Sequence, residues 1–167
     1  DMWAHSSITA RLSREIARDL GGSSRIQEDA FLSGMLHDVG KLLLLEQPKY
    51  ISNIKWQQSQ NGDLSFAEAE YLEFSTSHAE VGGYLLGLWG LPDPVVEAVA
   101  CHHRPMQISG GTSPVLAATY LANALICRAG GEEIKFDETL LNQGKITKML
   151  PSWSNQAKRL HEELNHS

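Results

Sequence analysis

The sequence predicts an all-α protein that folds as a compact helical bundle. Apolar residues recur at the spacing of one helix face from the start of the chain. In the first segment they stand four positions apart, at Ile8, Leu12, Ile16 and Leu20. No segment shows the sustained alternation of apolar and polar residues that marks a half-buried strand. These observations predict amphipathic helices and no sheet.

The next helices are indicated by their start and stop signals. Ser24 with Gln27 matches a capping box, which predicts a second helix that runs through the segment SGMLHDVGKLLLL, residues 33–45. Pro48 marks the end of that segment. After a polar stretch, the segment SFAEAEYLEF at 65–74 has the composition of a further helix.

Capping signals also divide the middle of the chain. Ser77 and Glu80 form a second capping box, which places His78 at the first residue of the helix that follows. Asp93 is the expected cap of the next helix, with Pro94 in its first turn. This helix ends at a His-His pair just before a proline, so both imidazoles are expected at a helix C-terminus.

The last part of the chain gives weaker helical patterns. Ser113-Pro114 begins a strongly apolar helix that ends at Gly130-Gly131, and three short amphipathic segments follow it. We therefore expect one domain over residues 1–167, in which residues 132–167 form a C-terminal helical extension. Because helical patterning begins at once, we also expect an N-terminal subdomain to be absent from this chain and to pack against Trp3.

Composition and charge exclude several classes of function. The 167 residues carry a net charge of −6 and no long basic cluster, which argues against binding to nucleic acid. The longest apolar run, Leu42–Leu45, is too short to span a membrane. Cys101 and Cys127 are the only cysteines, which is typical of a reducing, cytoplasmic setting rather than of a disulfide framework.

Five of the seven histidines stand at helix ends or on apolar helix faces, where helical bundles build metal sites: His5, His37, His78, His102 and His103. The pair His37-Asp38, with Lys41 three residues on, interrupts an apolar segment. Burying such groups without partners costs several kcal/mol each. They must therefore neutralise one another, or hold an ion or a ligand.

Each histidine alone has an ordinary structural explanation. His5 can be a core imidazole bonded to a backbone carbonyl, His78 a polar residue near a cap, and the His-His pair a favourable charge at a helix C-terminus. The combined pattern favours a metal pocket. A purely structural cluster of His37, Asp38 and Lys41 remains a third interpretation, although a buried ion pair seldom stabilises a fold more than packed apolar residues do.

Several longer motifs carry a family resemblance: WAHS at 3–6, FLSGMLHDVGKLLL at 31–44, HAEVGGYLLGLWGLP at 78–92, VVEAVACHHRP at 95–105 and AATYLANAL at 117–125. In these segments the sequence resembles the HD superfamily of metal-dependent phosphohydrolases, most closely the HDOD branch, the HD-related output domains of bacterial signalling proteins. The resemblance implies a compact HD-type helical bundle that forms the C-terminal part of a longer HDOD unit.

The resemblance also implies roles for the polar residues. The residues that match a first metal position are His5, His37 and Asp38. Those that match a second position, with Asp38 as the bridge, are His78, His102 and His103. Lys41 matches a lysine that faces a substrate phosphate, so Asp38 and Lys41 are the candidate catalytic residues.

Two departures from the catalytic pattern stand out. Asn123 occupies the place of an aspartate ligand, and the residues after His103 lack the Glu, Asp-Gly and Gly-Tyr-Pro elements of the cyclic-di-GMP phosphodiesterases. An amide leaves more cationic charge uncompensated than a carboxylate would. We therefore expect the first position to be weak or empty. A set of histidines with one carboxylate suits iron, manganese, nickel or zinc at the second.

The function implied is a regulatory output domain with a histidine-rich metal pocket and little or no hydrolase activity. The alternative is an active metal-dependent phosphohydrolase that acts on nucleotides or cyclic dinucleotides. In that case a metal-bound hydroxide would attack the phosphorus, and Lys41 would offset the charge on the phosphate. Expected partners are a regulatory protein or an upstream sensor or receiver domain, and a nucleotide or phosphoester ligand.

Overall fold

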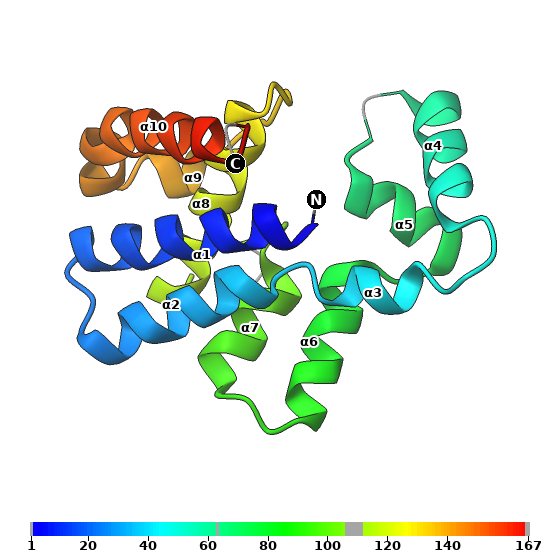
Figure 1. Ribbon diagram of the computed structural model, residues 1–167, viewed down its shortest axis with the longest axis horizontal. Helices are drawn as coiled ribbons and strands as arrows, with labels where there is room; N and C mark the ends of the chain where they lie inside the picture. The colour runs from blue at the N-terminus through cyan, green and yellow to red at the C-terminus, as the bar shows by residue number, and fades with distance from the viewer. Residues whose placement is uncertain (1, 63, 106–111, 166–167) are drawn as a thin grey trace.

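The regular elements of the structure are all helical, as the sequence predicts (Figure 1). The computed structural model describes residues 2–62, 64–105 and 112–165. Within these ranges the helices are α1 (Met2–Asp19), α2 (Ser24–Leu36), α3 (Gly40–Leu44), α4 (Tyr50–Asn61), α5 (Phe66–Phe74), α6 (His78–Leu88), α7 (Asp93–Cys101), α8 (Pro114–Ala129), α9 (Glu138–Leu141) and α10 (Gly144–Asn165). Among them, none combines the length and the apolar character that a membrane span needs.

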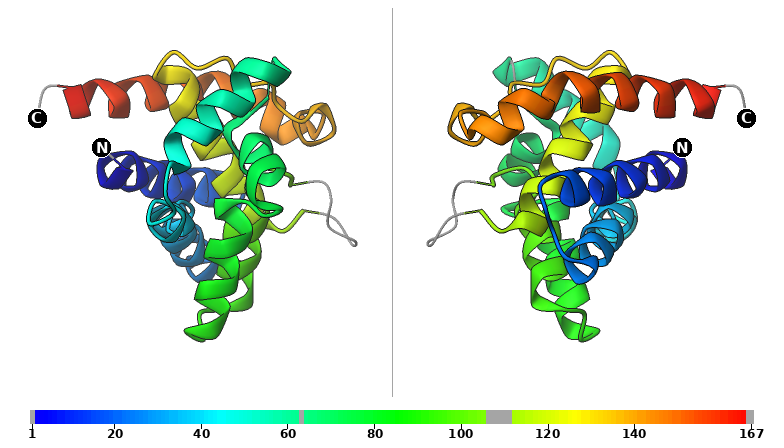
Figure 2. Two further views of the ribbon diagram at one scale, coloured as in Figure 1. Left: turned by 90° about the vertical axis from the view of Figure 1, so that its right-hand side faces the viewer. Right: turned by 90° about the vertical axis from the view of Figure 1, so that its left-hand side faces the viewer.

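The main hydrophobic core lies between α1, α2, α7, α8 and α10. Ile16 of α1, Leu121 of α8 and Trp153 of α10 are fully buried in it. Nearly every residue along α8 from Val115 to Ile126 is buried, so this helix is the central element of the bundle. The views in Figure 2 show α10 lying across one end of the molecule, and the hairpin of α6 and α7 projecting at the other.

The hairpin of α6 and α7 is held against α3 by very close backbone contact. A Cβ atom on Gly40 would lie 2.0 Å from the carbonyl oxygen of His78 and 2.7 Å from the backbone nitrogen of Gly82. Only glycine fits there. The contact fixes the start of α3 directly against the first turn of α6, and it brings the residue two positions before Gly40, Asp38, close to His78.

The helices α4 and α5 form a small lobe with a core of its own. Tyr50, Ile54 and Ala69 are buried in this second core, together with Leu44 from α3. In Figure 1 the lobe lies to the right, apart from α1, α8 and α10. Among the helices, α4 packs chiefly against α5, and α5 in turn meets α6.

The predicted caps are confirmed at α6 and shifted at two other helices. Ser77 and Glu80 form a capping box in which both reciprocal hydrogen bonds are present. At α2 the prediction was wrong by one residue, because Ser23 is the cap and its hydroxyl accepts the Ile26 N–H. At α7 the helix begins at Asp93 itself, so Asp93 is the first helical residue and not the cap.

Two helix boundaries differ from the prediction for physical reasons. The segment 33–45 is not one helix, because the backbone tightens between α2 and α3 into hydrogen bonds that span three residues, such as Val39 N–H to Leu36 O at 2.9 Å. At the other end of the chain, the helix α10 continues through Pro151, where two separate segments were expected. Burial of Ile146 and Trp153 on one face of α10 outweighs the hydrogen bond that the proline removes.

Candidate metal centre

The His37-Asp38 pair lies in the turn between α2 and α3, not on a helix as the sequence suggested. His37 is fully buried, and its Nδ1–H donates to the carbonyl of Gly34 at 2.8 Å. This hydrogen bond fixes the tautomer and leaves the lone pair on Nε2. Burial lowers the pKa of His37 to about 4, so at neutral pH the ring is uncharged and able to act as a ligand.

The carboxylate of Asp38 lies between two groups of histidines. Its Oδ1 atom is 3.3 Å from Nε2 of His78, and its Oδ2 atom is 3.5 Å from Nε2 of His37. Lys41 donates to Oδ2 at 2.8 Å. Burial alone would raise the pKa of Asp38, but His37, His78 and Lys41 together hold it well below its usual range. Asp38 is therefore an anion that lies between His37 and His78.

The first position consists of His5, His37 and Asp38, whose ligand atoms lie within 4.8 Å of one another. Asn123, from the central helix α8, adds its side-chain amide. Nε2 of His5 lies 3.0 Å from Oδ1 of Asn123 and 3.2 Å from Nε2 of His37. Because an amide oxygen only accepts, His5 carries its proton on Nε2 and donates it there. The polar atoms of this position thus satisfy one another.

The second position consists of His78, His102 and His103, whose ligand atoms also lie within 4.8 Å of one another. His102 donates its Nδ1–H to the carbonyl of Val99 at 2.7 Å. Its Nε2 atom is buried and has no hydrogen-bond partner among the described residues. Nε2 of His103 lies 2.9 Å from Nε2 of His78. Three ring nitrogens thus converge here, and one of them carries an unsatisfied lone pair.

The two positions form one continuous centre. The ring centroids of His37 and His102 are 5.1 Å apart, and those of His78 and His102 are 5.4 Å apart. Burial lowers the pKa of His102 and of His103 well below the ordinary value. The residues singled out from the sequence therefore form one connected cluster that includes Asp38: His5, His37, Lys41, His78, His102, His103 and Asn123.

Sequence reasoning missed one buried residue of the centre, Glu70 of α5. Its Oε2 atom accepts the Nδ1–H of His78 at 2.6 Å and the backbone N–H of His78 at 2.8 Å. Burial alone would lower the pKa of His78, but its hydrogen bonds with Asp38 and Glu70 raise it. A signal for Glu70 was present, because it stands midway between Phe66 and Phe74 at a spacing of four and thus on the apolar face of its helix.

The donor set fits a transition-metal ion at the second position. Three imidazole nitrogens, with an Asp38 oxygen 3.3 Å from that of His78, suit zinc, iron, manganese or nickel better than magnesium. The unpartnered Nε2 of His102 is the observation that favours an ion, because a buried acceptor without a donor costs free energy and a cation would satisfy it. The purely structural interpretation accounts for the Lys41–Asp38 ion pair but not for this atom.

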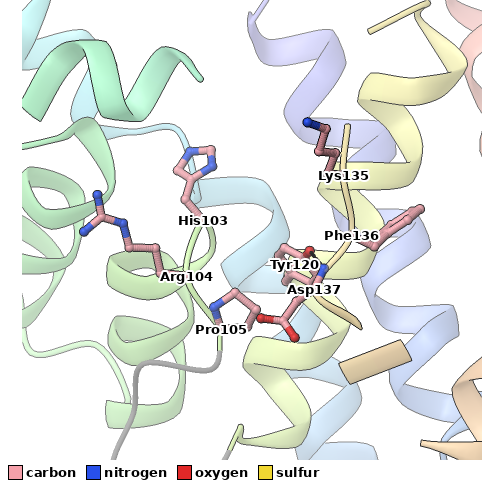
Figure 3. A pocket seen from close by; sticks show the side chains of 7 residues that line it. All are labelled: His103, Arg104, Pro105, Tyr120, Lys135, Phe136 and Asp137. Atoms are coloured by element: carbon pink, nitrogen blue, oxygen red, sulfur yellow. Dashed lines mark hydrogen bonds between the residues drawn. The ribbon is translucent and has the colours of Figure 1, made fainter. Parts of the chain in front are cut away.

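A cleft of about 280 Å³ lies beside the second position, with His103 on its wall (Figure 3). Tyr120 and Lys135 line it as well. The Tyr120 oxygen accepts the backbone N–H of Asp137 at 2.7 Å, which leaves the phenol hydrogen able to donate elsewhere. The Arg104 guanidinium points away from the cleft and lies over the ring of Tyr71. The segment after His103, in which the sequence lacks the Gly-Tyr-Pro elements, lies mostly outside the described residues.

The overall arrangement of the chain is similar to that of solved structures. An HDOD domain protein with unknown function from Geobacter sulfurreducens is 26% identical, with a TM-score of 0.68, over 99% of this chain and 58% of that one. The HD domain of the L. monocytogenes phosphodiesterase PgpH, solved with cyclic-di-AMP, is 15% identical, with a TM-score of 0.52, over 99% of this chain and 90% of that one. The second likeness concerns the fold alone.

The sequence of the chain also matches a relative of known sequence and a protein-family model. An uncharacterized protein of Treponema pallidum (strain Nichols) is 23% identical over 132 residues, which are 78% of this chain and 25% of that protein. The chain therefore spans a quarter of the length of this relative. The model of the HDOD domain family matches residues 1–105, the part that holds Asp38 and the five histidines of the centre. On this match, the chain belongs to the HDOD domain family.

Proposed function

We propose that this chain is a regulatory signalling domain that binds one transition-metal ion at the second position and hydrolyses phosphoesters slowly or not at all. The ligands would be His78, His102 and His103, with Asp38 as the oxygen donor. The single observation that carries the proposal is the Nε2 atom of His102, which has no hydrogen-bond partner among the described residues. His102 itself is only 1% exposed.

The first position supports the second half of the proposal, slow or absent hydrolysis. Asn123 contributes no negative charge, so Asp38 would be the only anionic ligand if two divalent ions were bound. Their uncompensated charge is costly in a buried site. In addition, His5 donates its proton to Asn123, and this hydrogen bond would have to break before His5 could bind an ion through Nε2. These groups favour one bound ion over a dinuclear centre.

Elemental analysis of protein purified without chelator or metal-affinity resin tests metal binding. We expect about one zinc, iron, manganese or nickel ion per chain. His102→Ala should lose most of the metal, whereas His161→Ala, a histidine of α10 outside the centre, should retain it. Equal metal content in the wild type and in His102→Ala, or no metal in the wild type after incubation with each ion, would refute the proposal.

Activity is tested with a cyclic dinucleotide, a nucleotide and a generic phosphodiester. We expect turnover at or near the uncatalysed rate for all three substrates, with the metal bound. Fast turnover that His102→Ala abolishes would overturn the regulatory interpretation and favour the alternative, a metal-dependent phosphohydrolase.

The cleft beside His103 is the observation that favours this alternative. It adjoins the second position, and Lys135 on its wall supplies a positive charge for a phosphate. The PgpH domain, which shares the fold, is a phosphodiesterase solved with cyclic-di-AMP, so a nucleotide is a reasonable ligand to test here. A metal ion at the second position would supply an activated water and polarise a phosphoryl oxygen. Lys41, however, is already paired with Asp38.

A protein partner for this domain is expected from the sequence alone. We propose that the signal passes between this domain and either a separate regulatory protein or a sensor or receiver domain in the same polypeptide. Affinity purification of the tagged full-length protein, in metal-loaded and chelator-treated form, would test this. A partner retained equally by the wild type and by His102→Ala would show that the metal pocket does not control the interaction.

A further inference from the structure

A buried carboxylate connects the α4–α5 lobe to the candidate metal centre. Glu70 of α5 is 0% exposed. One of its oxygens accepts both the ring Nδ1–H and the backbone N–H of His78, at 2.6 and 2.8 Å. The other accepts the hydroxyl hydrogen of Tyr50, the first residue of α4. A buried carboxylate is tolerated only where donors surround it, and here three donors come from two helices.

The hydrogen bond from His78 to Glu70 determines which ring nitrogen faces the centre. With Nδ1–H directed at Glu70, Nε2 points toward Asp38 at 3.3 Å and toward His103 at 2.9 Å. An imidazole that donates one N–H to a carboxylate is a stronger ligand through its other nitrogen, and its ring is held in one orientation. Among His37, His78 and His102, His78 alone donates to a carboxylate, since the other two donate to backbone carbonyls.

The other contacts of the lobe with the centre are ring and apolar contacts: the Phe66 ring of α5 lies 6.3 Å from that of His78 between centroids, and Leu44 of α3 is buried in the lobe's core. This core, which also holds Tyr50, Ile54 and Ala69, is separate from the main core. The other carboxylate that joins the two helices, Glu73, accepts from Asn53 at 2.7 Å and from Gln57 at 3.0 Å, so it links α4 to α5 without contacting a histidine. Tyr50 and Glu70 are therefore the polar side chains through which α4 and α5 reach His78.

We propose that Glu70 is a positioning residue for the metal ligand His78, and that through Tyr50 it couples the α4–α5 lobe to metal occupancy. The inference rests on the proposed function, since it requires an ion at the second position. A cation on Nε2 withdraws electron density from the ring, so Nδ1–H becomes a stronger donor to Glu70. By linkage, whatever strengthens the contact of the lobe with His78 also strengthens binding of the ion. The lobe is then the element that transmits metal occupancy.

The first test measures zinc affinity by competition with a chromophoric chelator, using Glu70→Gln and the matched control Glu73→Gln. Both glutamates lie on α5 and bond to α4, but only Glu70 contacts His78. We expect Glu70→Gln to weaken zinc binding by about 10- to 100-fold, the usual effect of losing such a carboxylate. Glu73→Gln should leave the affinity within about twofold of the wild type. Equal losses in the two variants would mean that Glu70 acts only through general stability, and would overturn the inference.

The second test follows hydrogen exchange of the amides of α4 and α5 with and without zinc. In the wild type and in Glu73→Gln, zinc should slow exchange in both helices, and Glu70→Gln should abolish this difference. If Glu70→Gln does not fold, Tyr50→Phe decides the matter, because it removes one hydroxyl from a buried site and should reduce the zinc-dependent protection of α4 more than that of α6. Unchanged protection in the variant that folds overturns the inference.

The outcomes separate this inference from the proposed function. A wild-type protein that takes up no metal would refute both. A wild type that binds zinc through His102, while Glu70→Gln binds it equally well and keeps zinc-dependent protection of α4 and α5, would leave the metal site in place and refute the role of Glu70.

Discussion

Nε2 of His5 donates to Oδ1 of Asn123 at 3.0 Å, across the interface between α1 and α8. These residues are 118 positions apart, and the contact puts an amide where a metal position with His37 and Asp38 would need a further ligand. The amide completes a set of neutral hydrogen bonds. A carboxylate in place of the Asn123 amide would put a negative charge next to His5 and His37, and this charge would attract a cation.

We therefore predict that Asn123→Asp creates a second metal site. A carboxylate at this place adds one negative charge next to two imidazoles and makes a set of two nitrogens and two oxygens with Asp38. Elemental analysis should show an increase from about one to about two ions per chain. Phosphodiester turnover should rise with the second ion if the cleft admits the substrate.

Asn123→Ala is the control for this variant. It removes the same hydrogen bond without adding a charge, so its metal content should stay at the wild-type level. The side chain is half-buried, and we expect both variants to remain folded, as judged by circular dichroism. A content of about one ion per chain in folded Asn123→Asp would show that charge at this position does not limit binding.

The glycine contact between α3 and α6 leads to a second prediction. A Cβ on Gly40 would lie 2.0 Å from the His78 carbonyl oxygen, so Gly40→Ala must push α3 away from α6. We expect the free energy of unfolding to fall by about 3 kcal/mol or more, the upper range for overpacking a tight site. Because Asp38 lies two residues before Gly40, metal affinity should fall as well.

Gly87→Ala is the matched control, since the nearest atom to a Cβ at this glycine of α6 is 3.9 Å away. Alanine has the higher helix propensity, so this variant should be as stable as the wild type or more stable by up to about 1 kcal/mol. Urea denaturation of both variants measures the effect. Equal stabilities for the two variants would contradict the close contact.

The sequence predicted most of the helices and the histidines of the centre because both follow local rules, but it missed α4, which lies in the stretch that was interpreted as polar. The capping box of Ser77 and Glu80 places His78 at the start of α6, and the end of α7 places His102 and His103, without any knowledge of the rest of the fold. The resemblance then indicated that Asn123 belongs to the same site. The structure brings it within 3.0 Å of His5.

What the sequence did not predict depends on contacts between helices. Glu70 is buried because α5 packs its apolar face toward α6, and no spacing rule connects it to His78 across the intervening turn. Likewise, the start of α10 joins its later turns because Ile146 and Trp153 are buried in one core, although Pro151 between them suggests a break. In both cases, tertiary packing outweighs the local signal.

Acidification should destabilise the metal-free protein through His37. Its pKa is about 4 in the folded chain and 6.5 in an unfolded one, so below pH 6.5 the unfolded state takes up a proton that the folded state does not. Above pH 6.5 His37 leaves the free energy of unfolding unchanged. As the pH falls from 6.5 toward 4, proton uptake by the unfolded state lowers the free energy of unfolding by roughly 3 kcal/mol. The lowered pKa values of His102 and His103 act in the same direction, whereas the raised pKa of His78 acts in the opposite direction.

Urea denaturation between pH 7 and pH 4.5 in the presence of a chelator measures this dependence. His37→Gln, which does not titrate at this position, should show a shallower decrease in the free energy of unfolding over the same range. A wild-type protein whose stability is constant between these pH values would contradict the burial of neutral histidines in the centre.

The packing of α10 gives the last prediction. Trp153 is 0% exposed in the main core, and its Nε1–H donates to Oδ2 of Asp19 at 3.0 Å, at the end of α1. Replacing a buried tryptophan by alanine costs about 3–5 kcal/mol, so Trp153→Ala should lower the free energy of unfolding by that amount. Trp153→Phe keeps most of the ring volume and loses the hydrogen bond, so we expect a smaller loss of about 1–2 kcal/mol.

Trp56→Ala is the control, because Trp56 of α4 is 58% exposed and its replacement should change the stability little. Thermal or urea unfolding of the three variants distinguishes two cases. If Trp153→Ala is strongly destabilising, the segment 132–167 is part of the folding unit that carries the metal centre, since α10 and α1 share one core and α1 holds His5. If it is as mild as Trp56→Ala, then α10 is a dispensable extension and the centre should keep its metal after residues 132–167 are removed.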